Sequence, residues 1–299
     1  MIGFRGVVCL ILMLLGLKLA AADVTHQEAE SGESTLSMEL QAGVELDSGV
    51  VVEFPPPLRL ASESDAALKQ LEKIASRHGW KRFSWNSVNA PLLIKVQSVK
   101  NGDGDTIGHE VHSAFIAYAP LGKLRDEQIM EATFGKVDQE AKKESTTLIK
   151  LESEELEKLG LTPNADEHES YARIAFPILK KVVVEGIIQM QGQDTEKSVM
   201  LAWKLAADID SAPATWVGIK PNSVGTLVRS DPKPYRGLAG YMAVSQTGLE
   251  ENQLLIESHL VIHEPTDWFS GSKLLRSKLS TLMQENARSM RRKLRKLDE

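Results

Sequence analysis

The sequence predicts an α+β fold in which a twisted, mainly antiparallel sheet carries a long C-terminal helix packed across it. Two patterns lead to this prediction. From residue 275 onward, apolar residues recur every three or four positions, whereas apolar and polar residues alternate in several segments between residues 182 and 263. A third observation is that strands and helices do not alternate regularly, so a parallel βαβ arrangement is not indicated.

The C-terminal helix is the most regular of the expected elements. Its apolar stripe consists of Leu275, Leu279, Met283, Ala287, Met290, Leu294 and Leu297. Because these residues share one face, that face must be buried. Ser270 and Ser272 stand just before the stripe, where their hydroxyls can accept hydrogen bonds from the first backbone N–H groups.

The last turns of this helix are strongly basic and carry Arg288, Arg291, Arg292, Lys293, Arg295 and Lys296. Such cations either complement the partial negative charge at the helix C-terminus or contact a polyanion such as a wall polymer, lipid headgroups or nucleic acid. No aromatic residue is interleaved among these charges for base stacking, which favours the first interpretation.

The N-terminus has the pattern of a secretory signal. Arg5 precedes an apolar run over residues 7–17, and small residues follow at 20–22. The run is too short to span a bilayer comfortably, so residues 1–22 are predicted to be a cleaved signal peptide. No later segment is a transmembrane candidate, and we expect an exported soluble protein, periplasmic or secreted. Cys9, the only cysteine, lies inside the signal, so the mature chain has no disulfide or cysteine ligand.

Composition divides the mature chain into two parts. Residues 23–47 contain seven acidic residues and no Lys or Arg, and the formal net charge of the whole chain is −6. Segments with little to bury and self-repelling charge stay unfolded, so residues 23–49 are expected to form a disordered acidic arm. Residues 50–299 are expected to form one α+β domain, with a candidate sub-boundary near residues 160–170.

Several elements are expected in the first half of this domain. A capping pattern predicts a helix from Ser62 to about residue 75, ended by Gly79. Residues 125–134 and 153–159 are predicted to be two further helices.

Residues 92–96 and 111–119 are predicted to form a hairpin. Its turn has Asn101, Asp103 and Asp105 at the first, third and fifth positions of a calcium loop. Thr106 and His112 stand where that loop requires Gly and Glu, so a turn is favoured over a calcium site.

Strands dominate the second half. Residues 182–191 and 198–209 are expected to form a hairpin around a turn at residues 192–194, and the meander is expected to continue through residues 216–219, 237–245 and 253–263.

A possible metal site is carried by the last of these strands. Glu257, His259 and His263 project from one face of it, and at most Glu257 and His259 are close enough to share an ion. A solvent-facing polar side of an amphipathic strand explains them more simply. His109 and His112 are expected to point to opposite faces, so they are not a local chelating pair.

Two further patterns suggest hydrolytic enzymes. Ser270-Gly271-Ser272-Lys273 resembles the nucleophile motif of penicillin-binding enzymes, but no Lys-Thr-Gly strand follows it, so helix capping is preferred. The acidic pairs Glu154-Glu155 and Asp208-Asp210 have the residue type that glycoside hydrolysis needs. In a chain with 41 acidic residues such pairs arise by chance, so no roles are assigned.

An aromatic group in the second half either forms core or lines a ligand pocket; it consists of Trp203, Trp216, Tyr235, Tyr241, Trp268 and Phe269. For the pocket alternative, the candidate lining residues are Trp203, Trp216, Leu275, Leu279 and Met283. No dinucleotide fingerprint or P-loop is found, and no cofactor is predicted.

Two blocks carry a resemblance to a known family. Residues 234–241 read Pro-Tyr-Arg-Gly-Leu-Ala-Gly-Tyr, and residues 264–271 read Glu-Pro-Thr-Asp-Trp-Phe-Ser-Gly, followed at 274–279 by Leu-Leu-Arg-Ser-Lys-Leu. Together with residues 112–121, these blocks resemble an uncharacterised family of exported bacterial proteins, and the resemblance covers residues 80–297. It implies one intact domain and export, and it supplies no catalytic residue.

Three functional hypotheses remain open. The first is an exported, non-enzymatic protein that binds a partner or has a structural role. The second is a carrier of an apolar small molecule, because the order of elements is similar to that of helix-grip lipid-transfer domains; this similarity concerns the fold alone. The third is a hydrolase whose residues are dispersed along the chain, which requires a cleft where titratable groups with perturbed pKa values converge.

Overall fold

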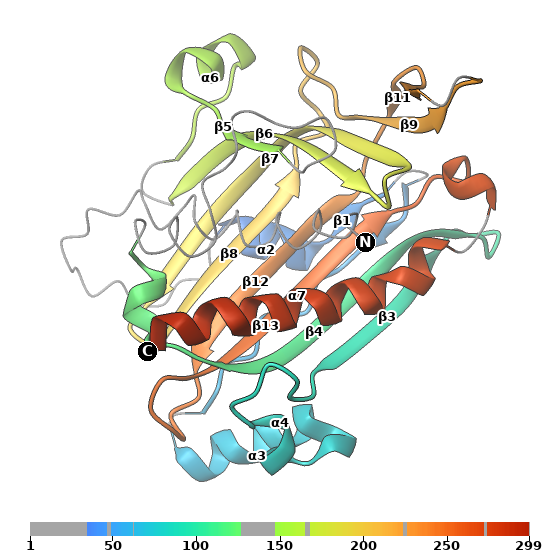
Figure 1. Cartoon of the computed structure of the whole chain (residues 1–299). Coiled ribbons are helices and arrows are strands. Elements are labelled where there is room, and N and C mark those ends of the chain that lie inside the picture. Colours follow the sequence, from blue (N-terminus) through green and yellow to red (C-terminus); the bar gives the residue numbers. More distant parts are fainter. Residues whose placement is uncertain are drawn as a thin grey trace.

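A computed structural model describes residues 35–46, 49–61, 63–126, 147–164, 168–223, 226–271 and 274–298. Its main feature is one sheet of 11 strands. The long helix α7 (Leu274–Asp298) crosses one face of this sheet (Figure 1). The predicted α+β class and the predicted place of the C-terminal helix are confirmed.

The body of the sheet is antiparallel throughout and runs in the order β5, β6, β7, β8, β12, β13, β4, β3. A branch of three short strands leaves it, because β9 pairs with the first residues of β7 and also pairs with β10 and β11. The strands are β3 (Leu93–Lys100), β4 (Thr106–Tyr118), β5 (Thr147–Lys150), β6 (Glu169–Ile178), β7 (Val182–Thr195), β8 (Ser198–Leu205), β9 (Thr215–Pro221), β10 (Leu227–Arg229), β11 (Lys233–Pro234), β12 (Leu238–Gln246) and β13 (Gln253–His263).

The face under α7 holds the larger part of the core. All seven predicted stripe residues of α7 are buried. They pack on alternate residues of the central strands, among them Leu201 and Trp203 of β8 and Leu260 and Ile262 of β13. The period-two pattern of the strands and the helical period of α7 therefore meet in one apolar layer.

The opposite face is covered by the segment that precedes β3. Helix α2 (Thr35–Ala42) and the short pair β1 (Val44–Glu45) and β2 (Val51–Val52) lie over β8, β12 and β13. Helices α3 (Ser64–Ala75) and α4 (Trp80–Phe83), joined by the 3₁₀ turn Ser76–His78, lie over the far ends of β4 and β13.

The expectation of a disordered arm over residues 23–49 is wrong for residues 35–46. Leu36 and Leu40 of α2 are each 1% exposed, and the N–H of Leu36 donates a hydrogen bond of 2.6 Å to Gln191. Glu39 forms an ion pair with Lys204 of β8. Average composition concealed an amphipathic helix whose acidic residue has a partner on the sheet. Residues 23–34, and the predicted signal peptide at 1–22, lie outside the described residues.

Most of the other expected elements are found. The predicted helix at 153–159 is α6 (Ser153–Leu159), which ends at Gly160 with a positive φ of 68°. The 101–105 turn joins β3 to β4, and the side-chain oxygen of Asn101 accepts hydrogen bonds from the N–H groups of Asp103 and Asp105. The side chain of Asn101 therefore stabilises the turn, as the turn interpretation requires.

The position of one turn and the number of strands differ from the expectations. The β7–β8 turn lies at residues 196–197 instead of 192–194, because β7 continues through Gly192 to Thr195. Strands β5 and β6 were not predicted.

Residues 127–134 of the expected helix, and Ser62, Ser272 and Lys273, lie outside the described residues. No helix in the described ranges combines the length and apolar character needed to cross a membrane.

A tight contact fixes β12 against its neighbours. A Cβ atom at Gly240 would lie 2.6 Å from the carbonyl oxygen of His259 and 2.7 Å from the indole of Trp203. The absence of a side chain at residue 240 therefore lets the indole of Trp203 pack directly against the backbone of β12.

We expect Gly240→Ala to lower the free energy of unfolding by about 1–3 kcal/mol, the usual cost of overpacking a core. Gly102→Ala is the matched control, because a Cβ there has no neighbour within 4 Å. Denaturant unfolding of both variants measures the difference, and equal stability of the two would contradict this account of the contact.

Candidate functional site

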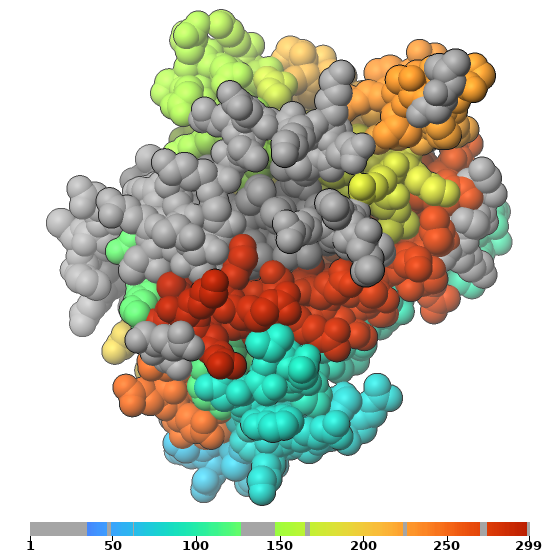
Figure 2. Space-filling model, in the orientation of Figure 1, coloured from blue at the N-terminus to red at the C-terminus, as the bar shows by residue number. Residues whose placement is uncertain are grey.

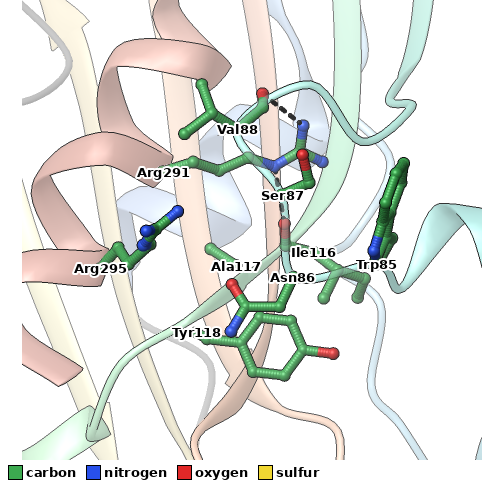
Figure 3. Close-up of a pocket in the computed structure, with 9 residues that line it drawn as sticks. All are labelled: Trp85, Asn86, Ser87, Val88, Ile116, Ala117, Tyr118, Arg291 and Arg295. Atoms are coloured by element: carbon green, nitrogen blue, oxygen red, sulfur yellow. Dashed lines mark hydrogen bonds between the residues drawn. The ribbon is translucent and has the colours of Figure 1, made fainter. Parts of the chain in front are cut away.

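The end of α7 is anchored by a buried arginine. Arg291 is 5% exposed, and its guanidinium donates hydrogen bonds to the carbonyl oxygens of Ile116 at 2.8 Å, Ala90 at 2.5 Å and Pro91 at 2.9 Å. The carbonyl of Val88 lies 3.5 Å away. Figure 3 shows this side chain reaching from α7 to the segment that leads from α4 to β3.

The electrostatics of Arg291 fit an internal role. Its guanidinium carbon lies 5.1 Å from the centre of the Phe115 ring, within the range of a cation–π contact. Burial, and then the nearby charge of Arg288, lower the pKa of Arg291 to about 10. The side chain stays charged at neutral pH, since its pKa remains well above 7, and backbone carbonyls satisfy its N–H groups.

Arg291 was one of the six cations named for the alternative of polyanion contact, but its buried guanidinium is bonded to backbone carbonyls and does not face solvent. Contact of the helix end with a polyanion stays a prediction. The other basic residues of the helix end differ. Arg288, Arg292, Arg295 and Lys296 are exposed, and Lys293 is half-buried. Spacings of four and three place Arg288, Arg292 and Arg295 on one stripe beside Arg291.

An aromatic and basic segment lies near the end of α7, where Trp85 lines one hollow together with Arg291 and Arg295. Residues 80–85 read Trp-Lys-Arg-Phe-Ser-Trp, and in this segment Lys81, Arg82 and Trp85 are exposed. Figure 2 shows the blue-green segment around α4 directly beneath the red α7. We call the surface formed by Trp80, Lys81, Arg82, Trp85, Arg288, Arg292 and Arg295 the aromatic–basic face.

Two hollows belong to this face. The first lies between Trp85, Tyr118, Arg291 and Arg295, and its volume of about 10 Å³ is close to what one water molecule needs. It is therefore a small gap where α7 packs against the segment that follows α4. The second is open and shallow and is lined by His78, Gly79, Trp80, Lys81, Arg82 and Trp85. Neither hollow has a carboxylate among its described lining residues.

Hydrogen bonds in this contact region also fix the residues on either side of Trp85. The hydroxyl of Tyr118 donates a hydrogen bond of 2.6 Å to the carbonyl oxygen of Ser84, and Arg291 binds the carbonyls from residue 88 onward. The backbone that carries the exposed Trp85 is therefore tied down at both ends. Sequence reasoning missed this face, although two tryptophans around a Lys-Arg pair are a local signal for it.

A second group of titratable residues lies on the opposite face of the sheet. The histidine–glutamate cluster consists of Glu110, His112, Tyr241, Glu257 and His259. His112 and His259 face each other across β4 and β13, with ring centres 5.8 Å apart. His112 lies 3.1 Å from Glu257, and His259 lies 2.9 Å from Glu110, so each histidine has a glutamate diagonally across the strand pair.

The cluster is covered by the chain between β2 and α3. Phe54 packs on His259 with 4.8 Å between ring centres, and the N–H of Leu58 donates a hydrogen bond of 2.9 Å to Glu257. Burial lowers the pKa of His259, and the charge of Glu110 opposes this shift. Burial, and then Glu257, raise the pKa of Tyr241, so the phenol remains protonated.

The expectation of a solvent-facing polar strand is therefore wrong. Glu257, His259 and His263 are each less than 9% exposed, because the N-terminal segment covers that face. His109 and His112 do lie on opposite faces; His109 is buried 2.5 Å from Glu264 under the α7 side. Within the described ranges, no three His, Cys, Asp or Glu side chains are arranged to hold a metal ion.

The five candidate lining residues are brought together by the fold. Trp203, Trp216, Leu275, Leu279 and Met283 belong to one apolar cluster between the sheet and α7, and each is at most 6% exposed. So little accessible surface indicates core packing. The hypothesis that they line a ligand cavity stays a prediction.

Four of the six predicted aromatic residues, Trp216, Tyr235, Trp268 and Phe269, form the corner that leads into α7, whereas Tyr241 lies on the opposite face of the sheet. The rings of Tyr235 and Trp268 stack with centres 5.6 Å apart, and Trp216 meets Trp268 edge to face. The hydroxyl of Tyr235 donates a hydrogen bond of 3.0 Å to the carbonyl oxygen of His263. Burial, and then Glu264, raise the pKa of Tyr235. Phe269, which is partly buried, packs against Trp268.

Three carboxylates of the remaining acidic pairs, those of Glu154, Glu155 and Asp208, form ion pairs at the surface. Glu154 pairs with Lys158 in the same helix, Glu155 lies 3.7 Å from Arg173, and Asp208 pairs with Arg236. Exposed pairs of this kind are ordinary surface features. Nothing in their surroundings assigns them a catalytic role.

Comparison of the chain with protein-family models and with curated proteins gives no match. The resemblance to exported bacterial proteins therefore stays a prediction, and the geometry alone carries the functional argument.

We expect Arg291→Gln to lower the free energy of unfolding by about 3 kcal/mol or more, since each hydrogen bond to a charged group contributes about 1.5–3 kcal/mol. Arg292→Gln, one residue away and exposed, is expected to change it by no more than about 0.5 kcal/mol. Urea unfolding of both variants tests the anchor, and similar stabilities would show that Arg291 is not one.

The pKa of His259 predicts a pH dependence of stability. Its pKa is lower in the folded protein than the ordinary 6.5, so the unfolded chain takes up the proton first. Stability is therefore complete above about pH 6.5 and falls as the pH drops toward the lowered pKa, by up to about 1.4 kcal/mol per pH unit for one proton.

The variant His259→Phe keeps an aromatic ring against Phe54 and should lose this part of the slope between pH 7 and 5. His78→Asn, at a half-buried residue outside the histidine–glutamate cluster, is the control and should keep the wild-type slope. Thermal or urea unfolding at several pH values measures it, and an unchanged slope in His259→Phe would exclude His259 as the source.

Proposed function

We propose that the protein is an exported, non-enzymatic binding protein that attaches to an anionic partner through the aromatic–basic face. The observation that carries this proposal is the convergence of two segments about 200 positions apart in the chain. Trp85 lines one hollow with Arg291 and Arg295 of α7 and a second hollow with Lys81 and Arg82, and no carboxylate is among the described residues that line either hollow.

The negative net charge of the whole chain makes a cluster of cations at this face unexpected. The formal net charge is −6, with 41 acidic and 35 basic residues, so two neighbouring hollows lined by cations and by no described carboxylate are not expected from composition. Clustered cations raise the local concentration of an anionic partner and accelerate its association. The exposed Trp85 and the half-buried Trp80 beside them add contact area that charge alone does not provide.

The structure gives less support to an enzyme. A hydrolase needs titratable groups in an accessible cleft, where they can reach a substrate. The histidine–glutamate cluster contains groups with shifted pKa values, but Phe54 and Leu58 cover it, and hydrogen bonds and ring contacts with this cover involve Glu257 and His259. These contacts support a structural role for the cluster.

An apolar small molecule is the second proposed partner, favoured by the gathering of Trp203, Trp216, Leu275, Leu279 and Met283 under α7. These side chains would have to separate to admit it, since they have little accessible surface. The anionic partner requires no such rearrangement, because its proposed contacts are already on the surface.

We expect the triple variant Arg288→Gln, Arg292→Gln, Arg295→Gln to elute from a heparin column at clearly lower salt than the wild type, because exposed charges bind through screened Coulomb attraction. The matched control is Lys150→Gln, Lys181→Gln, Lys220→Gln. It removes the same charge from exposed lysines on β5, β9 and the turn before β7. If both triple variants elute together, net charge and not this face determines binding.

A further inference from the structure

We infer that the anionic partner of the aromatic–basic face is a phospholipid bilayer, and that Trp85 enters its headgroup region. This inference rests on the proposed function, since it names the partner of the same face. Its starting point is Trp85, which is 62% exposed and is the most exposed large apolar side chain of the described residues.

The apolar character of the face separates a lipid surface from a soluble polyanion. Trp80 and Trp85 present ring surface in the same hollow as Lys81 and Arg82. A polymer whose contacts are charged groups would satisfy the cations and leave these rings in water. An anionic lipid offers both parts at once, because its headgroup carries the charge and the acyl boundary lies just beneath it.

The placement of the rings fits the interfacial region of a bilayer. Tryptophan is enriched at membrane–water interfaces, where an apolar ring with one polar N–H fits the boundary between headgroups and acyl chains. The cations stand on both sides of Trp85, on α4 and on α7, so they can contact headgroups while the indole inserts between them. Basic residues near an anionic membrane surface strengthen attachment by electrostatic attraction to the headgroups.

The rigidity of the segment favours docking as well. Ser84 is fixed by Tyr118, and the carbonyls that follow Trp85 are held by Arg291. A ring on a tied backbone loses little conformational freedom when it inserts, so more of the burial energy contributes to binding. Arg291 is therefore a positioning residue for Trp85, and it does not itself touch the partner.

The test uses the full chain and three partners: vesicles of phosphatidylcholine alone, vesicles that also contain phosphatidylglycerol, and heparin in solution. Sedimentation with vesicles gives the affinity, and tryptophan fluorescence reports whether an indole leaves water. Binding to phosphatidylcholine alone measures any attachment that does not depend on charge, and it is subtracted for every variant.

We expect Trp85→Ala to weaken binding to phosphatidylglycerol vesicles by about ten- to a hundredfold, since burying a large apolar side chain contributes about 1.5–3 kcal/mol. The blue shift of fluorescence on vesicle binding should be lost with it, while the affinity for heparin should change little. Leu227→Ala, at an exposed apolar residue of β10, is the control and should bind vesicles like the wild type. Trp85→Phe should recover part of the affinity.

The outcomes separate the two proposals. If heparin binds through the arginine stripe but phosphatidylglycerol vesicles do not bind, or bind without a contribution from Trp85, the lipid inference is overturned and the proposed function stands. If neither partner binds in a manner that depends on Arg288, Arg292 and Arg295, both are overturned.

Discussion

Every residue of β13 is buried, because α7 covers one face of the sheet and the N-terminal segment covers the other. Polar side chains on this strand must therefore find partners inside the protein, since an unpaired buried polar group is costly. Ser258 meets Ser113 at 2.8 Å on the α7 side, while Glu257 and His259 meet His112 and Glu110 on the other side. The double cover explains why the polar clusters lie where they do.

The same constraint explains the anchoring of α7. Apolar packing buries the stripe of the helix but does not specify how its last turns lie along the sheet. Arg291 fixes the orientation of these last turns, because its hydrogen bonds to backbone carbonyls of β4 and of the segment before β3 have a preferred geometry. Lys123 adds a further tie by donating a hydrogen bond to the carbonyl oxygen of Leu297. The position of α7, and with it the arginine stripe, follows from these contacts.

The sequence predicted those parts of the fold whose signal is local. The stripe of α7, the hairpin turn at Asn101 and the end of α6 at Gly160 each depend on residues within a few positions of one another. The expected solvent-facing side of β13 was wrong because its cover comes from residues more than 190 positions earlier, which no period-two pattern reveals. For the same reason, acidic composition alone did not show that Leu36 and Leu40 anchor a helix on the sheet.

The candidate site was harder to predict, because its residues become neighbours only through strand pairing and helix packing between distant parts of the chain. His112 and His259 become neighbours only through the pairing of β4 with β13, and Trp85 approaches Arg291 only through the packing of α4 near α7. The basic run itself was visible in the sequence, but it could not show that one of its arginines turns inward. The absence of aromatic residues within the run did not reveal the aromatic neighbour of the folded helix, because Trp85 comes from another part of the chain.

The negative charge of the rest of the molecule would influence how the aromatic–basic face is oriented toward the proposed anionic partner. At about 0.1 M salt, exposed charges more than about 10 Å apart are largely screened, so a docked partner senses the nearby cations more than the net charge of −6. At greater distance, and at lower salt, the negative remainder is repelled by an anionic surface. For the proposed anionic partner, attraction at one face and repulsion elsewhere would favour a single orientation, in which Trp85 and the arginine stripe of α7 approach first.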